Sequence, residues 1–228
     1  MMAGSNGRTN WVAIWISAAV VVVLVVIGVL VVWMNNQATS GGDAPQAGNI
    51  DAETGAISIG DGDDVLSEYL DFMCPVCNQF HQVYGDTIRG LIDDGSITFD
   101  IHPIAILDAK SQGTEYSTRA ANAMYCVAEE SEDAVLPFYD LLFENQPQET
   151  TPGLTDEQLI EFAGQAGAEG AADCITDGTH SRFVSMITEK TPVPEGAGGI
   201  GTPTVLLNGE FLQLTGDPEA DLVGRLAG

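Results

Sequence analysis

The stretch VLSEYLDFMCPVCNQF, residues 65–80, joins a strand-like run to a Cys-x-x-Cys motif. Residues 65–73 are rich in apolar and β-forming side chains, which is typical of a β-strand. After Pro75 the apolar residues recur at helical spacing, and proline is accepted in the first turn of a helix. We therefore expect Cys74 and Cys77 at the start of a helix that directly follows a strand.

The pattern continues on both sides of this junction. Residues 56–60 form a further candidate strand, and SITFDIHPI (96–104) alternates like a strand after the helix. A strand, helix, strand order predicts a crossover and a parallel pairing. The later residues read as helices at 114–130, 133–145, from Thr155, at 168–176 and at 178–189, then as a hairpin with an Asn208-Gly209 turn and a closing helix at 217–227.

An uncharged segment, WVAIWISAAVVVVLVVIGVLVVWM, occupies residues 11–34. A helix of this length rises about 36 Å, enough to cross a hydrocarbon core of about 30 Å. Arg8 precedes it and no further Lys or Arg follows until Arg89, which favours a cytoplasmic N-terminus. A cleaved signal peptide is the alternative, but its apolar core would be only about 7 to 15 residues long. We expect a retained single-pass anchor with the remaining chain outside the cell membrane.

The charge of the chain is strongly negative. All 33 acidic residues follow residue 42, and the formal net charge is −26. A domain of this charge repels nucleic acid and anionic membrane surfaces, so the composition argues against both as partners. Four cysteines remain outside the membrane on this topology, and an even number in an oxidising compartment favours disulfides.

The spacing of Cys74 and Cys77 puts both thiols on one face of the first helical turn. Backbone N–H groups and the positive end of the helix dipole stabilise a thiolate at Cys74, which makes it the nucleophile and Cys77 the resolving partner. Zinc or copper bound by the pair and His81 is an alternative, although a structural zinc site needs four ligands. A purely structural disulfide is another, but it would close a very small loop.

Together with the strand TFDIHPI, the helical middle and GIGTPTVLLNG (199–209), the cysteine motif resembles the DsbA-type branch of the thioredoxin superfamily, in its actinobacterial membrane-anchored form. The resemblance covers nearly all of residues 57–228. It implies an α/β, thioredoxin-like fold with a large inserted helical domain, preceded by one transmembrane helix. The expected organisation is a cytoplasmic N-terminus at 1–10, an anchor at 11–34, a flexible linker at 35–56, a thioredoxin-like domain at 57–110 and 191–228, and a helical insertion at 111–190.

The resemblance also implies roles for single residues. Cys74 matches the exposed nucleophile and Cys77 the buried partner. Pro203 matches the cis-proline that faces the redox pair, although an X-Pro bond is cis in only about 5 to 6% of cases without that context. Thr202 matches the residue whose backbone hydrogen-bonds an extended substrate segment.

Glu68 matches a buried acid that relays protons to the resolving thiol. Strand alternation places Glu68 on the face that carries core residues, where an acid needs a partner or a raised pKa. The alternative is a solvated surface glutamate. Strongly oxidising relatives carry histidine where this chain has Val76, so the resemblance implies a less oxidising pair here.

Cys126 and Cys174 match a structural disulfide of the actinobacterial relatives, and closing this loop of about 49 residues could stabilise the fold by about 4 kcal/mol. A second redox pair is the alternative, but neither cysteine has a basic neighbour in the sequence. The three histidines share no spacing, so the sequence predicts no ligand role for them.

These features predict an extracytoplasmic thiol:disulfide oxidoreductase that introduces disulfides into secreted proteins. Its substrates would be unfolded proteins with free thiols, and a DsbB-like or VKOR-like membrane protein would reoxidise it. We expect a monomer that needs no cofactor and no metal. The alternatives are an isomerase or reductase of the same fold, a membrane-anchored metal-binding module, and a noncatalytic peptide-binding module.

Overall fold

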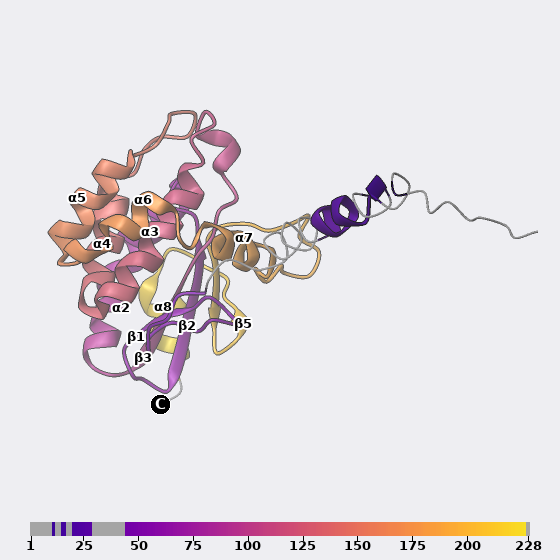
Figure 1. Ribbon diagram of the computed structural model, residues 1–228. Coiled ribbons are helices and arrows are strands. Elements are labelled where there is room, and N and C mark those ends of the chain that lie inside the picture. Colours follow the sequence, from indigo (N-terminus) through magenta and orange to yellow (C-terminus); the bar gives the residue numbers. More distant parts are fainter. Residues whose placement is uncertain (1–10, 12–14, 17–19, 29–43, 227–228) are drawn as a thin grey trace, which may run out of the picture. The chain divides into compact units, whose positions relative to one another are not determined.

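The computed structural model describes residues 11, 15–16, 20–28 and 44–226 (Figure 1). By its contacts the chain divides into two units, Met1–Gly41 and Gly42–Gly228. The predicted span at 11–34 falls in the first unit, where residues 20–28 are helical and residues 12–14, 17–19 and 29–34 lie outside the described part. None of the described helices is both long and apolar enough to cross a membrane.

The second unit contains a five-stranded mixed sheet with the strand order β1-β3-β2-β4-β5. Central strands β2 and β3 are parallel, as the strand, helix, strand order predicts, because helix α2 (Pro75–Asp93) forms the crossover between them. Strand β1 pairs antiparallel with β3, and β4 pairs antiparallel with β2 and β5. The strands are β1 (Ile57–Ile59), β2 (Asp64–Leu70), β3 (Ile97–Pro103), β4 (Thr204–Leu207) and β5 (Glu210–Phe211).

Strand β2 fixes the position of the site because its burial alternates strictly along the chain. Leu66, Glu68 and Leu70 face the core, while the residues between them are only partly covered. This alternation confirms the prediction that Glu68 faces inward and contradicts the alternative of a surface glutamate. The strand ends at Leu70, four residues before Cys74.

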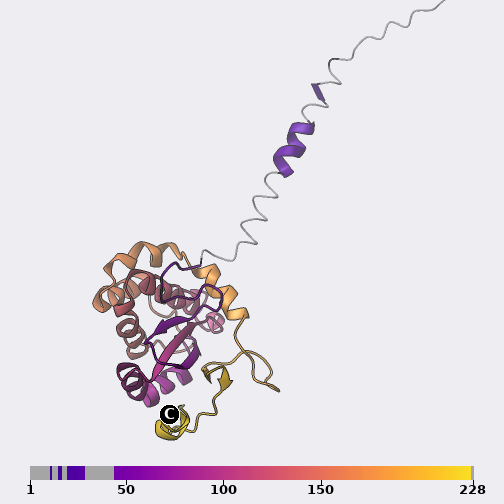
Figure 2. The same cartoon turned by 90° about the horizontal axis from the view of Figure 1, so that it is seen from below.

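The helices follow the predicted order. They are α2 (Pro75–Asp93), α3 (Tyr116–Glu130), α4 (Val135–Glu144), α5 (Asp156–Ala166), α6 (Ala172–Asp177), α7 (Ser181–Glu189) and α8 (Pro218–Asp221), with single 3-10 turns at Asp108–Lys110, Glu132–Ala134, Glu169–Ala171 and Val223–Arg225. Thr155 caps α5 as predicted, in a capping box with Gln158. Figure 2 shows the orange helices of the later part of the chain and α8 (yellow) on opposite sides of the domain.

Helix α3 is the centre of the helical insertion. Eleven of its fifteen residues are buried, which is the pattern of a helix surrounded by others. Helices α4 to α7 all contact it. Many of the buried residues are alanines, and their small side chains let neighbouring helices approach closely.

The predicted flexible linker at 35–56 is too long at its C-terminal end. Ile50 pairs with Ile57 in an isolated bridge, and both Ile50 and Ala56 are buried. Asp51 also accepts hydrogen bonds from the backbone N–H groups of Glu53 and Thr54. Because most of this segment is polar, the sequence pattern did not reveal the few apolar side chains that attach it to the domain.

Candidate active site at Cys74 and Cys77

The two cysteines lie at the junction between β2 and α2. Cys74 is the N-cap residue of α2, with extended backbone angles (φ −76°, ψ 117°), and Pro75 occupies the first turn. Both thiols are free, so the structure holds the pair in its reduced state. Cys77 is completely buried, whereas Cys74 is 6% exposed. Cys74 is therefore the more accessible thiol, but it is covered far more than the predicted exposed nucleophile.

The surroundings of Cys74 stabilise its thiolate. The pKa of Cys74 falls to about 5, chiefly because the Cys77 thiol donates a hydrogen bond to it, against the opposing effect of burial. Hydrogen bonds from the side chain of Thr202 and from the backbone N–H groups of Cys77 and Val76 lower the pKa further. The helix start thus stabilises the thiolate even with Val76 in place of a histidine.

The pKa of Cys77 is shifted in the opposite direction. Burial raises the pKa of Cys77 well above its ordinary value, and the hydrogen bond that it donates to Cys74 raises it further. The negative charges of Glu68 and Cys74 act in the same direction. At neutral pH the pair therefore consists of one thiolate, at Cys74, and one thiol, at Cys77. This division is the one that dithiol exchange requires.

Pro203 lies beside the pair, and the Thr202–Pro203 peptide bond is cis. The sulfur of Cys74 lies 3.5 Å from the carbonyl oxygen of Thr202. The structure thus brings together Cys74, Cys77, Thr202 and Pro203, which are up to 129 positions apart in the sequence.

An open cleft of about 340 Å³ adjoins Pro203. Val76 is half exposed at its wall, so the residue that departs from the strongly oxidising pattern faces the cleft. The cleft is lined by Val76, Gln79, Phe80, Val83, Tyr84, Pro203, Leu214, Thr215 and Gly216. Its largely apolar wall next to a reactive thiolate can accommodate an extended peptide segment.

Glu68 is completely buried and has one hydrogen-bond partner among the described residues. The Tyr139 hydroxyl of α4 donates a hydrogen bond to Oε2 of Glu68 at 2.7 Å. The other oxygen, Oε1, accepts no hydrogen bond from the described residues. Burial raises the pKa of Glu68 to about 8, and the hydrogen bond from Tyr139 opposes the rise. Glu68 can therefore take up and release a proton near neutral pH.

Asp71 is a residue of the site that the sequence pattern does not reveal. Its buried carboxylate accepts hydrogen bonds from the backbone N–H groups of Met73, Ile106 and Leu107 and from the hydroxyl of Ser117. Three of these bonds join the end of β2 to the loop after β3 and to α3, and the bond from Met73 is local. Burial raises the pKa of Asp71, and the four donors counteract it.

Gln146, just after α4, is a second residue that the sequence does not single out. Its Nε2 donates to the carbonyl oxygens of Phe72 and Cys74, at 3.0 and 2.9 Å. The Asn78 side chain donates to Oε1 of Gln146 and to the carbonyl of Phe143. The helical insertion therefore fixes the backbone on both sides of Met73.

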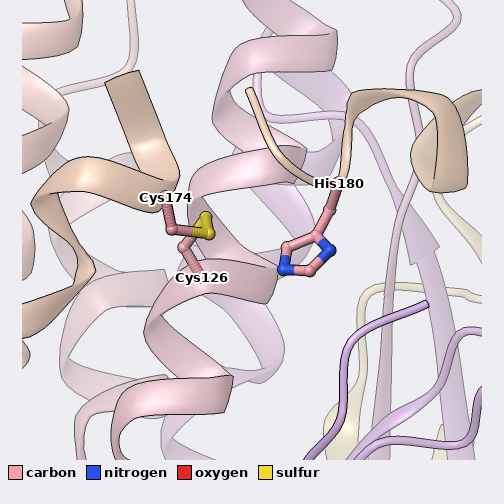
Figure 3. A group of neighbouring side chains, drawn as sticks. All are labelled: Cys126, Cys174 and His180. Carbon is pink, nitrogen blue, oxygen red and sulfur yellow. A yellow bond between two sulfur atoms is a disulfide. The ribbon is translucent and has the colours of Figure 1, made fainter. Parts of the chain in front are cut away.

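The remaining cysteines form the disulfide Cys126–Cys174, which joins α3 to α6. A ring nitrogen of His180 lies within 4.8 Å of both sulfur atoms, and Figure 3 shows the ring beside the bond. The ring also bonds Glu129, at 2.8 Å. His180 is thus the basic neighbour that the local sequence does not show.

The bond between the two sulfurs occupies the ligand atoms that a metal at this cluster would need. His81, the third ligand considered for a metal at the redox pair, instead bonds Asp140 at 2.8 Å.

Replacing both Cys126 and Cys174 by serine is expected to destabilise the domain by up to about 4 kcal/mol, because the unfolded chain loses a cross-link across 48 positions. Thiol exchange at Cys74 should persist at temperatures where the variant is folded. Thermal unfolding and an exchange assay on the same preparation test this. Lost exchange at unchanged stability would instead identify the disulfide as a redox relay.

Comparison with known proteins agrees with this geometry. A family model described as Thioredoxin matches residues 53–220. DsbA of Mycobacterium tuberculosis, solved in its reduced form, is 34% identical with a TM-score of 0.63, over 70% of this chain and 85% of that one. The reduced disulfide bond oxidoreductase DsbG of the same organism is 33% identical with a TM-score of 0.63, over 81% of this chain and 86% of that one.

One curated relative is a much longer protein of another class. The serine/threonine-protein kinase PknE of Mycobacterium tuberculosis is 32% identical over 148 residues, which are 62% of this chain and 26% of that protein. The chain thus spans about a quarter of the length of the curated relatives it matches. The family model, in contrast, covers well over half of the chain, including the redox pair and Pro203, and so the chain belongs to the thioredoxin family.

Proposed function

We propose that this protein is a thiol:disulfide oxidoreductase that introduces disulfides into secreted proteins by exchange at Cys74 and Cys77. The observation that carries the proposal is the pairing of a stabilised Cys74 thiolate with a buried Cys77 thiol beside cis-Pro203 and a cleft. The similar solved structures of DsbA and of DsbG, which is described as a disulfide bond oxidoreductase, support it.

The reaction begins with the pair as a disulfide. A substrate thiolate attacks Sγ of Cys74, the Cys74–Cys77 bond breaks, and Cys77 leaves with the electron pair and takes up a proton. A second substrate thiolate then attacks the substrate sulfur of this mixed disulfide, and Cys74 leaves as a thiolate. The substrate loses two electrons and gains a disulfide, while the pair is reduced. The low pKa of Cys74, about 5, makes it a good leaving group in this last step.

The substrate in this proposal is an extended segment with a free thiol, held along the cleft and by the backbone of Thr202. The localisation belongs to the same proposal: residues 11–34 anchor the chain in the cell membrane and the catalytic domain lies outside. The uncharged sequence of that segment and the absence of nearby basic residues after it support this arrangement. A DsbB-like or VKOR-like membrane protein would reoxidise the pair.

The reduction potential of Cys74/Cys77 separates an oxidase from a reductase. Stabilising the Cys74 thiolate stabilises the reduced form, so the potential should lie above that of thioredoxin, about −270 mV, and below that of the most oxidising relatives, about −120 mV. Equilibration of the full chain with glutathione buffers measures it. A potential at or below −270 mV would show that the protein reduces disulfides instead.

A further inference from the structure

Tyr139 connects the helical insertion to the proton chemistry of the redox pair. Its hydroxyl bonds Glu68 at 2.7 Å, and its side chain is buried. The ring is held in edge contacts by Phe72, Phe99 and Phe143, with centroid distances of 6.2, 6.2 and 5.0 Å. Since the ring cannot turn without disturbing this packing, the hydroxyl has one direction in which to donate.

Glu68, which accepts the hydrogen bond from this hydroxyl, can exchange a proton with a neighbouring group. Glu68 lies in the middle of β2, and its Oε1 is buried without a hydrogen-bond partner among the described residues. Its negative charge acts on the Cys77 thiol. A buried carboxyl with one oxygen fixed and the other free can exchange a proton with a neighbouring group.

We propose that Tyr139 is the positioning residue that holds Glu68 for proton exchange with Cys77. This inference rests on the proposed exchange function. When the pair is reoxidised, the Glu68 carboxylate takes the Cys77 proton, and the Cys77 thiolate attacks Sγ of Cys74 in the mixed disulfide. The bond from Cys74 to the partner sulfur breaks, and the partner leaves as a thiolate with the electron pair. In the opposite direction Cys77 leaves Cys74 and receives its proton from Glu68.

The hydroxyl of Tyr139 stabilises the charged form of Glu68, so its loss lowers the amount of carboxylate that can accept the Cys77 proton. Without it, the pKa of Glu68 rises and the carboxylate becomes scarcer at neutral pH. Loss of one hydrogen bond to a charged group corresponds to about one to two pH units. The step in which Cys77 passes its proton to Glu68 should slow, and the reverse step should slow by the same factor, because both cross the same transition state.

The test uses Tyr139→Phe in the full chain, with oxidised glutathione as the probe. Glutathione forms the mixed disulfide at Cys74, and the first-order release that follows reports attack by Cys77. In Tyr139→Phe this release should be about 10- to 100-fold slower at neutral pH, and its pH midpoint should rise by about one to two pH units. Attack of reduced glutathione on the oxidised pair is the reverse of this step, so it should slow by a similar factor and leave the equilibrium between the pair and glutathione nearly unchanged.

Tyr125→Phe is the matched control. Tyr125 is also a buried tyrosine of the insertion, but its hydroxyl donates to the carbonyl oxygen of Gly55, away from the redox pair. Tyr125→Phe should lower the free energy of unfolding by about as much as Tyr139→Phe does. It should leave the pH midpoint of glutathione release unchanged. A midpoint that moves equally in both variants would overturn the inference, because the shift would then reflect general loosening of the insertion.

Glu68→Gln completes the test, and the pH profile of this single variant does not depend on how well Tyr139→Phe folds. Glutamine keeps an acceptor for the Tyr139 hydroxyl but cannot titrate, so the pH midpoint should disappear. Adding Tyr139→Phe to Glu68→Gln should then have no further effect on release. An unchanged midpoint in Glu68→Gln, or a full Tyr139→Phe effect in its background, would overturn the inference. If the unmodified chain does not react with glutathione at all, the proposed function itself fails.

Discussion

Replacing Cys77 by serine is expected to trap the protein in a covalent adduct with a reduced substrate protein after mild oxidation. Cys74 keeps its thiolate in this variant, but no second thiol is present to displace the substrate. Replacing Cys74 by serine should abolish both the adduct and exchange, because Cys77 is completely buried and has a raised pKa. Non-reducing electrophoresis distinguishes the two variants.

The outcome depends on the different accessibility of the two thiols. Serine at Cys126 and Cys174 serves as the control, since these residues are already bonded to each other and should not change the adduct. An adduct of equal yield in the Cys74→Ser variant would contradict the assignment of roles. It would mean that the helix start opens enough to expose Cys77.

Replacing Asp71 by alanine is expected to destabilise the domain by about 5 kcal/mol. Four hydrogen-bond donors would lose their acceptor inside the protein, and each buried unsatisfied group costs about 1 to 3 kcal/mol. Denaturant unfolding of the reduced full chain measures the change. The loop at Ile106 and Leu107 should also become more open to hydrogen exchange, because Asp71 holds its two N–H groups.

Ser117→Ala is the matched control for Asp71. This variant removes one donor and leaves three bonds to the carboxylate, so it should lower stability by only about 1 kcal/mol. If the effects of Asp71→Ala and Ser117→Ala are similar, the carboxylate does not act as the central acceptor of the junction.

The redox pair and its setting could be predicted from the sequence because the signals are local. A strand pattern, a Cys-x-x-Cys motif and a helix pattern follow one another within residues 65–93 and give the β2–α2 junction directly. The alternation of side chains along β2 was enough to predict that Glu68 faces the core. The cis bond at Pro203 followed from a family resemblance, since the local sequence would have favoured trans.

The residues that support the pair could not be predicted because their partners are distant in the sequence. Tyr139 lies 71 positions from Glu68, and Gln146 lies 72 positions from Cys74. An aromatic residue at helical spacing predicts core packing, which Tyr139 also provides, and nothing in its neighbours indicates a bond to a buried acid. His180 is close to the Cys126–Cys174 disulfide only because α3 and the start of α7 pack together.

The most direct test of the central claim is the oxidation of a reduced, unfolded protein by the full chain with Cys74 and Cys77 in the disulfide state. The measurement follows the free thiols of the substrate and of the pair together, in the absence of other oxidants. The account predicts that two substrate thiols disappear for each pair that becomes reduced, and that Cys74→Ser abolishes the reaction. Substrate thiols that stay unchanged beside an intact Cys74–Cys77 disulfide would contradict it.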